Sequence, residues 1–148
     1  MQIEQALVEV AERWQARGLE SKLLPSASRS ELDEFEAKFQ VKLPDDFAMY
    51  LMTLGGMPLD ETDVCFIRFW PLSEIEPDAE VSQPGGDAYF NFADFAVCAH
   101  LYAIRLTPPA SSDVFLLGGP PEKVASSFTE FLTLYLTNPA AIHAMELL

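Results

Sequence analysis

The stretch Ser30–Gly56, SELDEFEAKFQVKLPDDFAMYLMTLGG, decides the fold of this chain. Its pattern predicts two short amphipathic helices, joined by a tight proline connection and closed by a pair of glycines. We place the start of the first helix at Ser30, whose hydroxyl would accept a backbone amide, with Asp33 as the acid of a capping box. The buried stripe of this helix has i, i+3, i+7 spacing and consists of Leu32, Phe35 and Phe39.

The second helix of the pair starts at Pro44, which suits a first helical position because its missing amide hydrogen is not needed there. Asp45 and Asp46 follow in the first turn, where the helix dipole favours negative charge. Gly55 and Gly56 are predicted to end the helix in the left-handed conformation. The core face has i, i+3, i+4, i+7 spacing and consists of Phe47, Tyr50, Leu51 and Leu54.

This pair of helices resembles the corresponding part of the SUKH superfamily. The segments that carry the resemblance are Glu31–Phe39, Leu43–Phe47 (LPDDF), Tyr50-Leu51 and Gly55-Gly56. An aromatic strand ending near Trp70, a strand-rich middle and a closing helix that begins at Ser127 also fit, so that the resemblance spans residues 26–135. Family members often carry glycines between the middle strands, whereas residues 95–106 of this chain contain none.

The resemblance implies a small α+β domain, of the kind found in fungal cell-wall-synthesis regulators and in bacterial immunity proteins that neutralise toxins. We expect residues 1–148 to form one such domain, long enough to bury about 68–70% of its extended surface. The order of helices, then strands, then helices favours a largely antiparallel twisted sheet of about 4–6 strands, flanked by N-terminal helices and a C-terminal helix.

The remaining helices are predicted at the two ends of the chain. The first covers residues 3–17 and ends at Gly18; its core-facing stripe consists of Ile3, Leu7, Val10 and Trp14. Ser127 and Glu130 predict a second capping box, which starts the closing helix. The buried face of that helix consists of Phe128, Phe131, Leu132 and Tyr135. After Pro139, residues 140–146 are expected to add a short last helix.

Strands are predicted at Val64–Trp70, Tyr89–Phe92 and Val114–Leu117, because these runs are rich in β-branched and aromatic residues. The run Phe95–Leu106 forms either two strands, Phe95–Cys98 and Leu101–Leu106, or one bent strand with a bulge near His100. The segment Ser73–Glu80 is expected to be a single helical turn or a loop. Gly118-Gly119-Pro120-Pro121 superficially resembles a phosphate-binding loop, but its two prolines offer no amides to a phosphate. We therefore predict that this segment turns from a strand into a helix.

Targeting and redox features are sparse. No apolar run reaches the roughly 18 residues of a membrane span, and the acidic N-terminus lacks the features of a signal peptide, so we expect a cytoplasmic protein. Cys65 and Cys98 lie in apolar runs and are expected to be buried, reduced thiols, with a disulfide as the less favoured alternative. We expect no metal and no cofactor, because there is no CxxC motif and neither histidine has ligand spacing to a cysteine.

The charge is strongly unbalanced. The chain has 23 acidic and 9 basic residues, a net charge of −14. Nucleic acids and anionic membranes would be repelled, because proteins bind them through clustered Lys and Arg. A basic protein would be attracted, although the same charge also serves solubility alone.

No catalytic arrangement is visible. His100, the one histidine near the predicted sheet, has no evident nucleophile or orienting acid. The many carboxylates lie in polar stretches, where nothing would drive their pKa values apart as acid and base catalysis requires. We therefore expect a protein that is not an enzyme and has no catalytic residues.

Three functions are compatible with these features. The first is an immunity protein that binds and neutralises a basic toxin domain such as a nuclease; the second is a regulatory adaptor for another cellular protein; the third, remote, is a small carboxylate-dependent hydrolase. A homodimer is also possible, because small sheets with exposed edges often pair. The predicted partner-binding residues combine acidic loops with a strand-end aromatic: Asp60, Glu61, Asp63, Trp70, Glu74, Glu76, Asp78 and Glu80.

Overall fold

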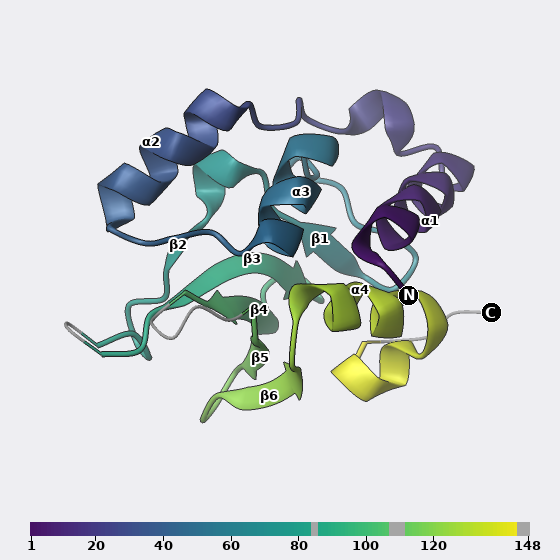
Figure 1. Cartoon of the computed structure of the whole chain (residues 1–148). Coiled ribbons are helices and arrows are strands. Elements are labelled where there is room, and N and C mark those ends of the chain that lie inside the picture. The colour runs from purple at the N-terminus through teal and green to yellow at the C-terminus, as the bar shows by residue number, and fades with distance from the viewer. Residues whose placement is uncertain (84–85, 107–111, 145–148) are drawn as a thin grey trace.

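The computed structural model describes residues 1–83, 86–106 and 112–144, and it has the predicted α+β architecture (Figure 1). The helices are α1 (Ile3–Ala16), α2 (Arg29–Phe39), α3 (Asp45–Thr53) and α4 (Phe128–Thr137), with 3-10 turns η1 (Glu20–Lys22), η2 (Leu72–Glu74) and η3 (Pro139–Ile142). The strands are β1 (Ile67–Phe69), β2 (Glu76–Pro77), β3 (Tyr89–Phe95), β4 (His100–Arg105), β5 (Val114–Leu117) and β6 (Glu122–Ala125).

The strands form one six-stranded antiparallel sheet in the order β1-β3-β4-β5-β6, with β2 also paired to β3. The predicted antiparallel sheet is therefore confirmed. Helices α1, α2 and α3 lie on one side of β3, and α4 follows the end of β6 (Figure 1). No helix among the described residues is long and apolar enough to cross a membrane.

The main core is aromatic and lies between the helices and the sheet. Phe47 of α3, Phe92 of β3 and Phe128 of α4 meet edge to face, with ring centroids 4.9–5.8 Å apart. Such contacts add about 0.5–1.5 kcal/mol per pair to the burial of the rings themselves. The predicted stripes supply this core: Leu7, Val10, Trp14, Leu32, Phe35, Tyr50, Leu51, Phe131, Leu132 and Tyr135 are all buried.

The predicted helix pair is present, but its first cap is displaced. The side chain of Ser28, not Ser30, accepts the amide of Glu31 at 3.1 Å, and Glu31 Oε1 accepts the amide of Ser28 at 3.0 Å. The capping box is therefore Ser28–Glu31, which lies two residues earlier than predicted. Helix α3 begins at Asp45, so Pro44 is its N-cap rather than its first residue.

The glycine pair has a different role from the one predicted. Leu54 ends α3 in an extended conformation, with φ −124°, so no left-handed residue caps the helix. A Cβ on Gly55 would lie 1.7 Å from the carbonyl oxygen of Leu24, and only Gly56 has a positive φ, +83°. The pair is therefore needed because the connection before α2 passes directly against the end of α3.

The middle strands differ from both alternatives offered by the sequence. β3 continues through Phe95, a tight turn occupies residues 96–99, and β4 starts at His100. The register shift in this hairpin falls between Asn91 and Ala93, not near His100. The predicted strand Phe95–Cys98 is wrong, because Ala96, Val97 and Cys98 have φ of 54°, 55° and 65°.

Four further predictions are corrected. The strand predicted over Val64–Trp70 is limited to Ile67–Phe69, and Gly118–Pro121 turns into a strand, β6, rather than into a helix. Cys65 is buried as expected, whereas Cys98 is exposed in the β3–β4 turn. At the C-terminus the last helix is the 3-10 turn Pro139–Ile142, and the rest of the predicted segment, 145–146, lies outside the described residues.

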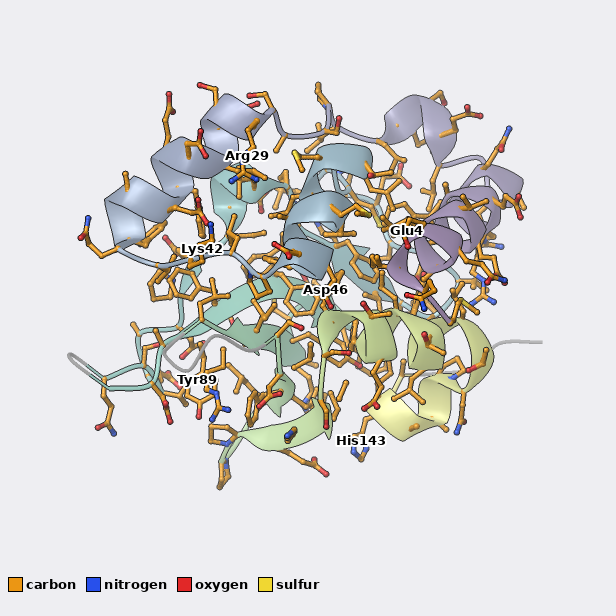
Figure 2. The ribbon with its side chains drawn as sticks, in the orientation of Figure 1. Glu4, Arg29, Lys42, Asp46, Tyr89 and His143 are labelled. Carbon is orange, nitrogen blue, oxygen red and sulfur yellow. The ribbon has the colours of Figure 1, made fainter. Side chains whose placement is uncertain are left out.

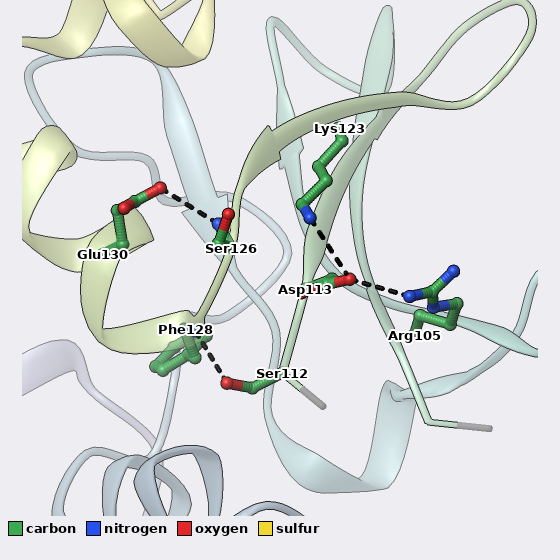
Figure 3. A network of polar contacts seen from close by, with 7 residues as sticks. All are labelled: Arg105, Ser112, Asp113, Lys123, Ser126, Phe128 and Glu130. Carbon is green, nitrogen blue, oxygen red and sulfur yellow. Dashed lines mark hydrogen bonds and ion pairs between the residues drawn. The ribbon is translucent and has the colours of Figure 1, made fainter. Parts of the chain in front are cut away.

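The start of α4 is fixed by side chains from several segments. The amide of Glu130 is accepted by Ser127 Oγ at 2.9 Å, while Glu130 Oε1 accepts the amide of Ser126, so the predicted capping box is shifted on one side (Figure 3). Asp46, in the first turn of α3, also faces α4 (Figure 2). Its Oδ2 accepts the amide and the hydroxyl of Thr129, both at 2.9 Å, and the hydroxyl of Ser112 at 3.2 Å.

We expect Asp46→Ala to lower the free energy of unfolding by about 2 kcal/mol, because it removes a charged acceptor shared by three donors. Asp45→Ala is the matched control, since Asp45 is exposed on the same helical turn and contributes only through the helix dipole, about 0.3–1 kcal/mol. Urea unfolding of both variants measures the difference. Equal losses would show that Asp46 does not connect the two helices.

Candidate functional site

The face of the sheet opposite the main core carries a second, smaller apolar cluster. It consists of Tyr89, Ala103, Phe115 and Leu117, with Val81 and Leu101 packed against it, and it contains no residue of a helix. In Figure 2, Tyr89 lies on the side of the sheet away from α2 and α3. The loop between β2 and β3 places Val81 on this cluster, so the acidic loop predicted from the sequence belongs to this outer face.

Arg68 joins the two acidic loops that were predicted to form one surface. Its Nε donates to the carbonyl of Pro58 at 3.0 Å, and its Nη2 contacts Glu74 Oε2 at 2.7 Å. Pro58 lies in the loop that contains Asp60, and Glu74 ends η2. The structure therefore brings the two loops together, and it does so through a buried cation that neutralises Glu74.

Asp63 lies inside the protein. Its side chain is buried, Oδ1 accepts the amides of Cys65 and Ile67 at 2.8 Å, and Oδ2 accepts the hydroxyl of Tyr135. That hydroxyl also accepts Trp14 Nε1 at 3.0 Å. Burial raises the pKa of Asp63, and the hydrogen bonds lower it in part. Asp63 therefore supports the fold and offers nothing to a partner.

Trp70 is half-buried and held in place. Its Nε1 donates to Asp94 Oδ2 at 2.6 Å, and Asp94 Oδ1 accepts the amide of Cys98 at 3.3 Å. Asp94 itself is buried on β3. The indole is thus connected to the β3–β4 turn through one carboxylate, which fixes both at the same end of the sheet.

The other predicted acids remain at the surface. Glu61 pairs with Lys22 at 3.0 Å. Asp60, Glu76 and Glu80 are exposed, Asp78 is half-buried, and none of the four forms an ion pair with a described residue. Asp78 Oδ1 accepts the amides of Glu80 and Val81, at 3.0 and 3.2 Å, which shapes the loop so that Glu80 projects from it.

Two cavities flank the Glu80–Val81 segment on the outer face. One, of about 450 Å³, extends to the β3–β4 turn and the β5–β6 turn; the other, of about 430 Å³, extends to Tyr89 and Pro121. Basic side chains nearby are paired with a carboxylate of their own. Arg105 and Lys123 contact Asp113 Oδ2 at 2.7 and 3.5 Å (Figure 3).

The sequence prediction missed the residues that complete this site. Arg68 was part of a predicted strand, and no feature marked it as the link between two loops. The exposed turn 96–99 was predicted in part as a strand, because it lacks the glycine or asparagine that usually signals a tight hairpin. Gly118 and Gly119 line the same cavity as Glu80 only in the folded protein.

The protein is thus an α+β domain whose outer face is acidic and partly hollow. Among the described residues, no group of His, Cys, Asp and Glu could hold a metal. Residues 26–134 match the model of the SMI1/KNR4 family (SUKH-1), and the chain belongs to this family. A search of curated proteins found no match. Membership of the SUKH family implies a protein–protein interaction domain.

The family match begins after α1, so the first helix lies outside it. This helix is nevertheless part of the folded unit. Arg13 donates to the carbonyls of Tyr135 and Leu136 at 3.2 and 2.9 Å, and Trp14 reaches the hydroxyl of Tyr135 in the core. The N-terminal segment therefore closes the end of the domain near α4.

Proposed function

We propose that this protein is a cytoplasmic, non-enzymatic immunity protein that binds a basic toxin domain and covers its active surface. The observation that carries the proposal is an acidic surface formed by the outer face and the loop that Arg68 joins to it, where Asp60, Glu76, Asp78 and Glu80 form no ion pair with the described part of the chain. A nuclease toxin needs positive charge around its active site to hold nucleic acid. A small domain of charge −14 competes for that surface directly.

The charge also has a kinetic role in this proposal. Opposite potentials on two proteins steer their encounter and raise association rates to about 10⁸–10⁹ M⁻¹s⁻¹ at low salt. An immunity protein benefits from such rates, because the toxin must be captured before it reaches its substrate.

The homodimer stays a prediction, and the charged, proline-preceded strand β6 is the kind of sheet edge that resists pairing.

The proposal is tested by reversing charge on this face. Asp60→Lys, Glu76→Lys and Glu80→Lys together are expected to reduce the association rate with the toxin domain encoded by a neighbouring gene by at least about tenfold at low salt, and to flatten its dependence on ionic strength. Stopped-flow fluorescence at several salt concentrations measures both quantities. Rescue of cells that express the toxin should be lost in parallel.

The matched control reverses three exposed acids of the helices, Glu4→Lys, Glu12→Lys and Glu34→Lys. It changes the net charge by the same amount but leaves the outer face intact. We expect a much smaller loss in association rate and retained rescue. If both triple variants behave alike, or if neither alters the rate, the acidic outer face is not the binding surface.

A further inference from the structure

The larger of the two outer cavities has three walls from separate parts of the chain. Asp78, Glu80 and Val81 form the first wall, the β3–β4 turn with His100 forms the second, and Gly118 with Gly119 forms the third. Its volume is about 450 Å³, which is room for a long side chain and its water. The cavity is therefore a candidate for receiving one residue of a partner.

The two carboxylates of this cavity have no cationic partner among the described residues; Asp78 accepts hydrogen bonds from neutral donors, the amides of Glu80 and Val81 and Asn91 Nδ2, and Glu80 is exposed. Among the described residues that line it there is no Lys or Arg, and His100 is the one basic group. Burial, and then the neighbouring Asp94, raise the pKa of the Cys98 thiol, so the thiol stays neutral and adds no charge. Arg105, Lys123 and Arg68 are held elsewhere by carboxylates.

The walls also suit the carbon chain of a basic side chain. Val81, Leu101 and Leu117 line the same cavity and belong to the outer apolar cluster. Lys and Arg place their methylene groups along apolar surface while the charged end meets acceptors. Arg is favoured over Lys here, because a planar guanidinium pairs with two carboxylate oxygens and stacks on an aromatic ring such as the His100 imidazole.

Next to Cys98 and Ala99 of the cavity lies an exposed and conformationally strained apolar pair, Val97 of the β3–β4 turn and Phe66, which we call the rim. Val97 is 87% exposed and Phe66 is 43% exposed, and the amide of Ala96 donates to the carbonyl of Phe66 at 3.0 Å. Phe66, Ala96, Val97 and Cys98 all have left-handed φ, between 54° and 65°. Each such residue costs about 1–2 kcal/mol relative to glycine, and a β-branched valine is the least suited to it. Strain of this kind concentrates at ligand contacts.

We propose that this cavity receives an arginine side chain of a basic protein partner, and that Val97 and Phe66 contact apolar side chains around that arginine. The inference rests on the proposed function and names the point of docking. The arginine would be the central anchor of the interface, with the exposed apolar pair excluding water from it.

The first experiment uses a short probe, the acetylated and amidated tripeptide Gly-Arg-Gly, with Gly-citrulline-Gly as its neutral isostere. Amide chemical shifts of the labelled protein should change saturably at Glu80, His100 and Gly119, with a Kd on the order of 1–10 mM for the arginine peptide. Glu80→Gln should weaken this binding at least about threefold. Equal shifts with the citrulline peptide, or shifts confined to another face, would overturn the proposal.

Two glycines provide a matched pair for the same titration. A Cβ on Gly118 would lie 2.5 Å from His100 Nδ1, so Gly118→Ala must displace the imidazole and reshape the cavity. Gly86 does not line the cavity, and its Cβ would meet only Gln83, at ordinary contact distances of 3.5 and 3.7 Å, so Gly86→Ala leaves the cavity as it is. We expect Kd to rise at least about fivefold for the first variant and to stay unchanged for the second. Identical affinities would contradict a role for this cavity.

The second experiment examines the rim with the toxin domain as partner. Val97→Gly should raise Tm by about 2–4 °C through relief of strain, and weaken toxin binding at least about fivefold. Ala96→Gly relieves similar strain without removing a large side chain, so it should raise Tm and leave affinity unchanged. If Val97→Gly binds as well as Ala96→Gly does, the rim takes no part in binding.

Neutralisation of the toxin without peptide binding would refute this inference alone, and peptide binding without neutralisation would refute the proposed function alone.

Discussion

Replacing Gly55 with alanine is expected to lower the free energy of unfolding by more than about 3 kcal/mol. The new Cβ would lie 1.7 Å from the carbonyl oxygen of Leu24, and backbone, unlike a flexible side chain, cannot turn aside. The segment would have to move away from α3. That movement breaks the backbone hydrogen bonds from Leu24 to Gly56 and from Ala27 to Leu51, at 3.0 and 2.9 Å.

Gly119→Ala serves as the stability control for this substitution, because its Cβ meets no atom within 4 Å. We expect its unfolding free energy to stay within about 0.5 kcal/mol of the wild type. Urea unfolding followed by tryptophan fluorescence suits both variants, since Trp14 is buried and Trp70 is half-buried. A Gly55→Ala variant as stable as the control would mean that the connection before α2 is not packed as the structure shows.

The second large effect is expected for Tyr135→Phe, at about 2–4 kcal/mol. The substitution keeps the ring but removes the hydroxyl, so that the buried carboxylate of Asp63 loses a donor and Trp14 Nε1 loses its acceptor. Tyr50→Phe is the matched control. Tyr50 contacts the same Phe69 ring, but its buried hydroxyl has no partner among the described residues, so its removal should raise stability by about 1 kcal/mol.

The Tyr135→Phe effect should also depend on pH. Because burial raises the folded-state pKa of Asp63, this residue contributes most at a pH below its unfolded pKa of about 3.9, and the contribution is lost as pH rises through the folded pKa. The hydrogen bond from Tyr135 lowers that folded pKa, so its loss penalises the ionised form further. The difference between the two proteins should therefore widen from acidic to neutral pH. A difference that is constant with pH would show that Asp63 and Tyr135 are not coupled.

Local periodicity was sufficient to predict the helical part of the fold. The stripes of α2 and α3 are visible in the sequence because each helix buries one face against the sheet. Helix ends were less certain: Ser28 and Ser30 are two residues apart, both precede an acid three residues later, and only the packing decides between them.

The strands were harder to predict, because the composition of some is untypical of strands and because one strand-like run contains a left-handed turn. β6 has the sequence EKVA, which is charged and short, and its pairing with β5 rather than its composition makes it a strand. The turn at Ala96–Ala99 lacks glycine, so propensity indicated a strand where the backbone is left-handed. Such positions are stabilised by long-range contacts, here the bond between Ala96 and Phe66, that no local window contains.

The candidate site was predictable only in outline. Abundant acids in the loops around Asp60 and Glu76 indicated a negative surface, and the structure places these loops side by side through Arg68. Asp63 and Glu80 belong to similar polar stretches, yet one is buried under Tyr135 and the other projects into solvent. Exposure of a loop acid depends on neighbours that are distant in sequence.

The outer apolar cluster is separate from the main core, and this separation bears on how the protein can evolve. The loop of residues 78–83 rests on Tyr89, Phe115 and Leu117 through Val81, while the aromatic core lies on the other face of the sheet. Substitutions in the loop thus leave the core packing untouched as long as Val81 is kept. If the protein has the proposed immunity function, its lineage can exchange this loop at little risk to folding as the toxins change. A laboratory library confined to the loop should yield mostly folded variants.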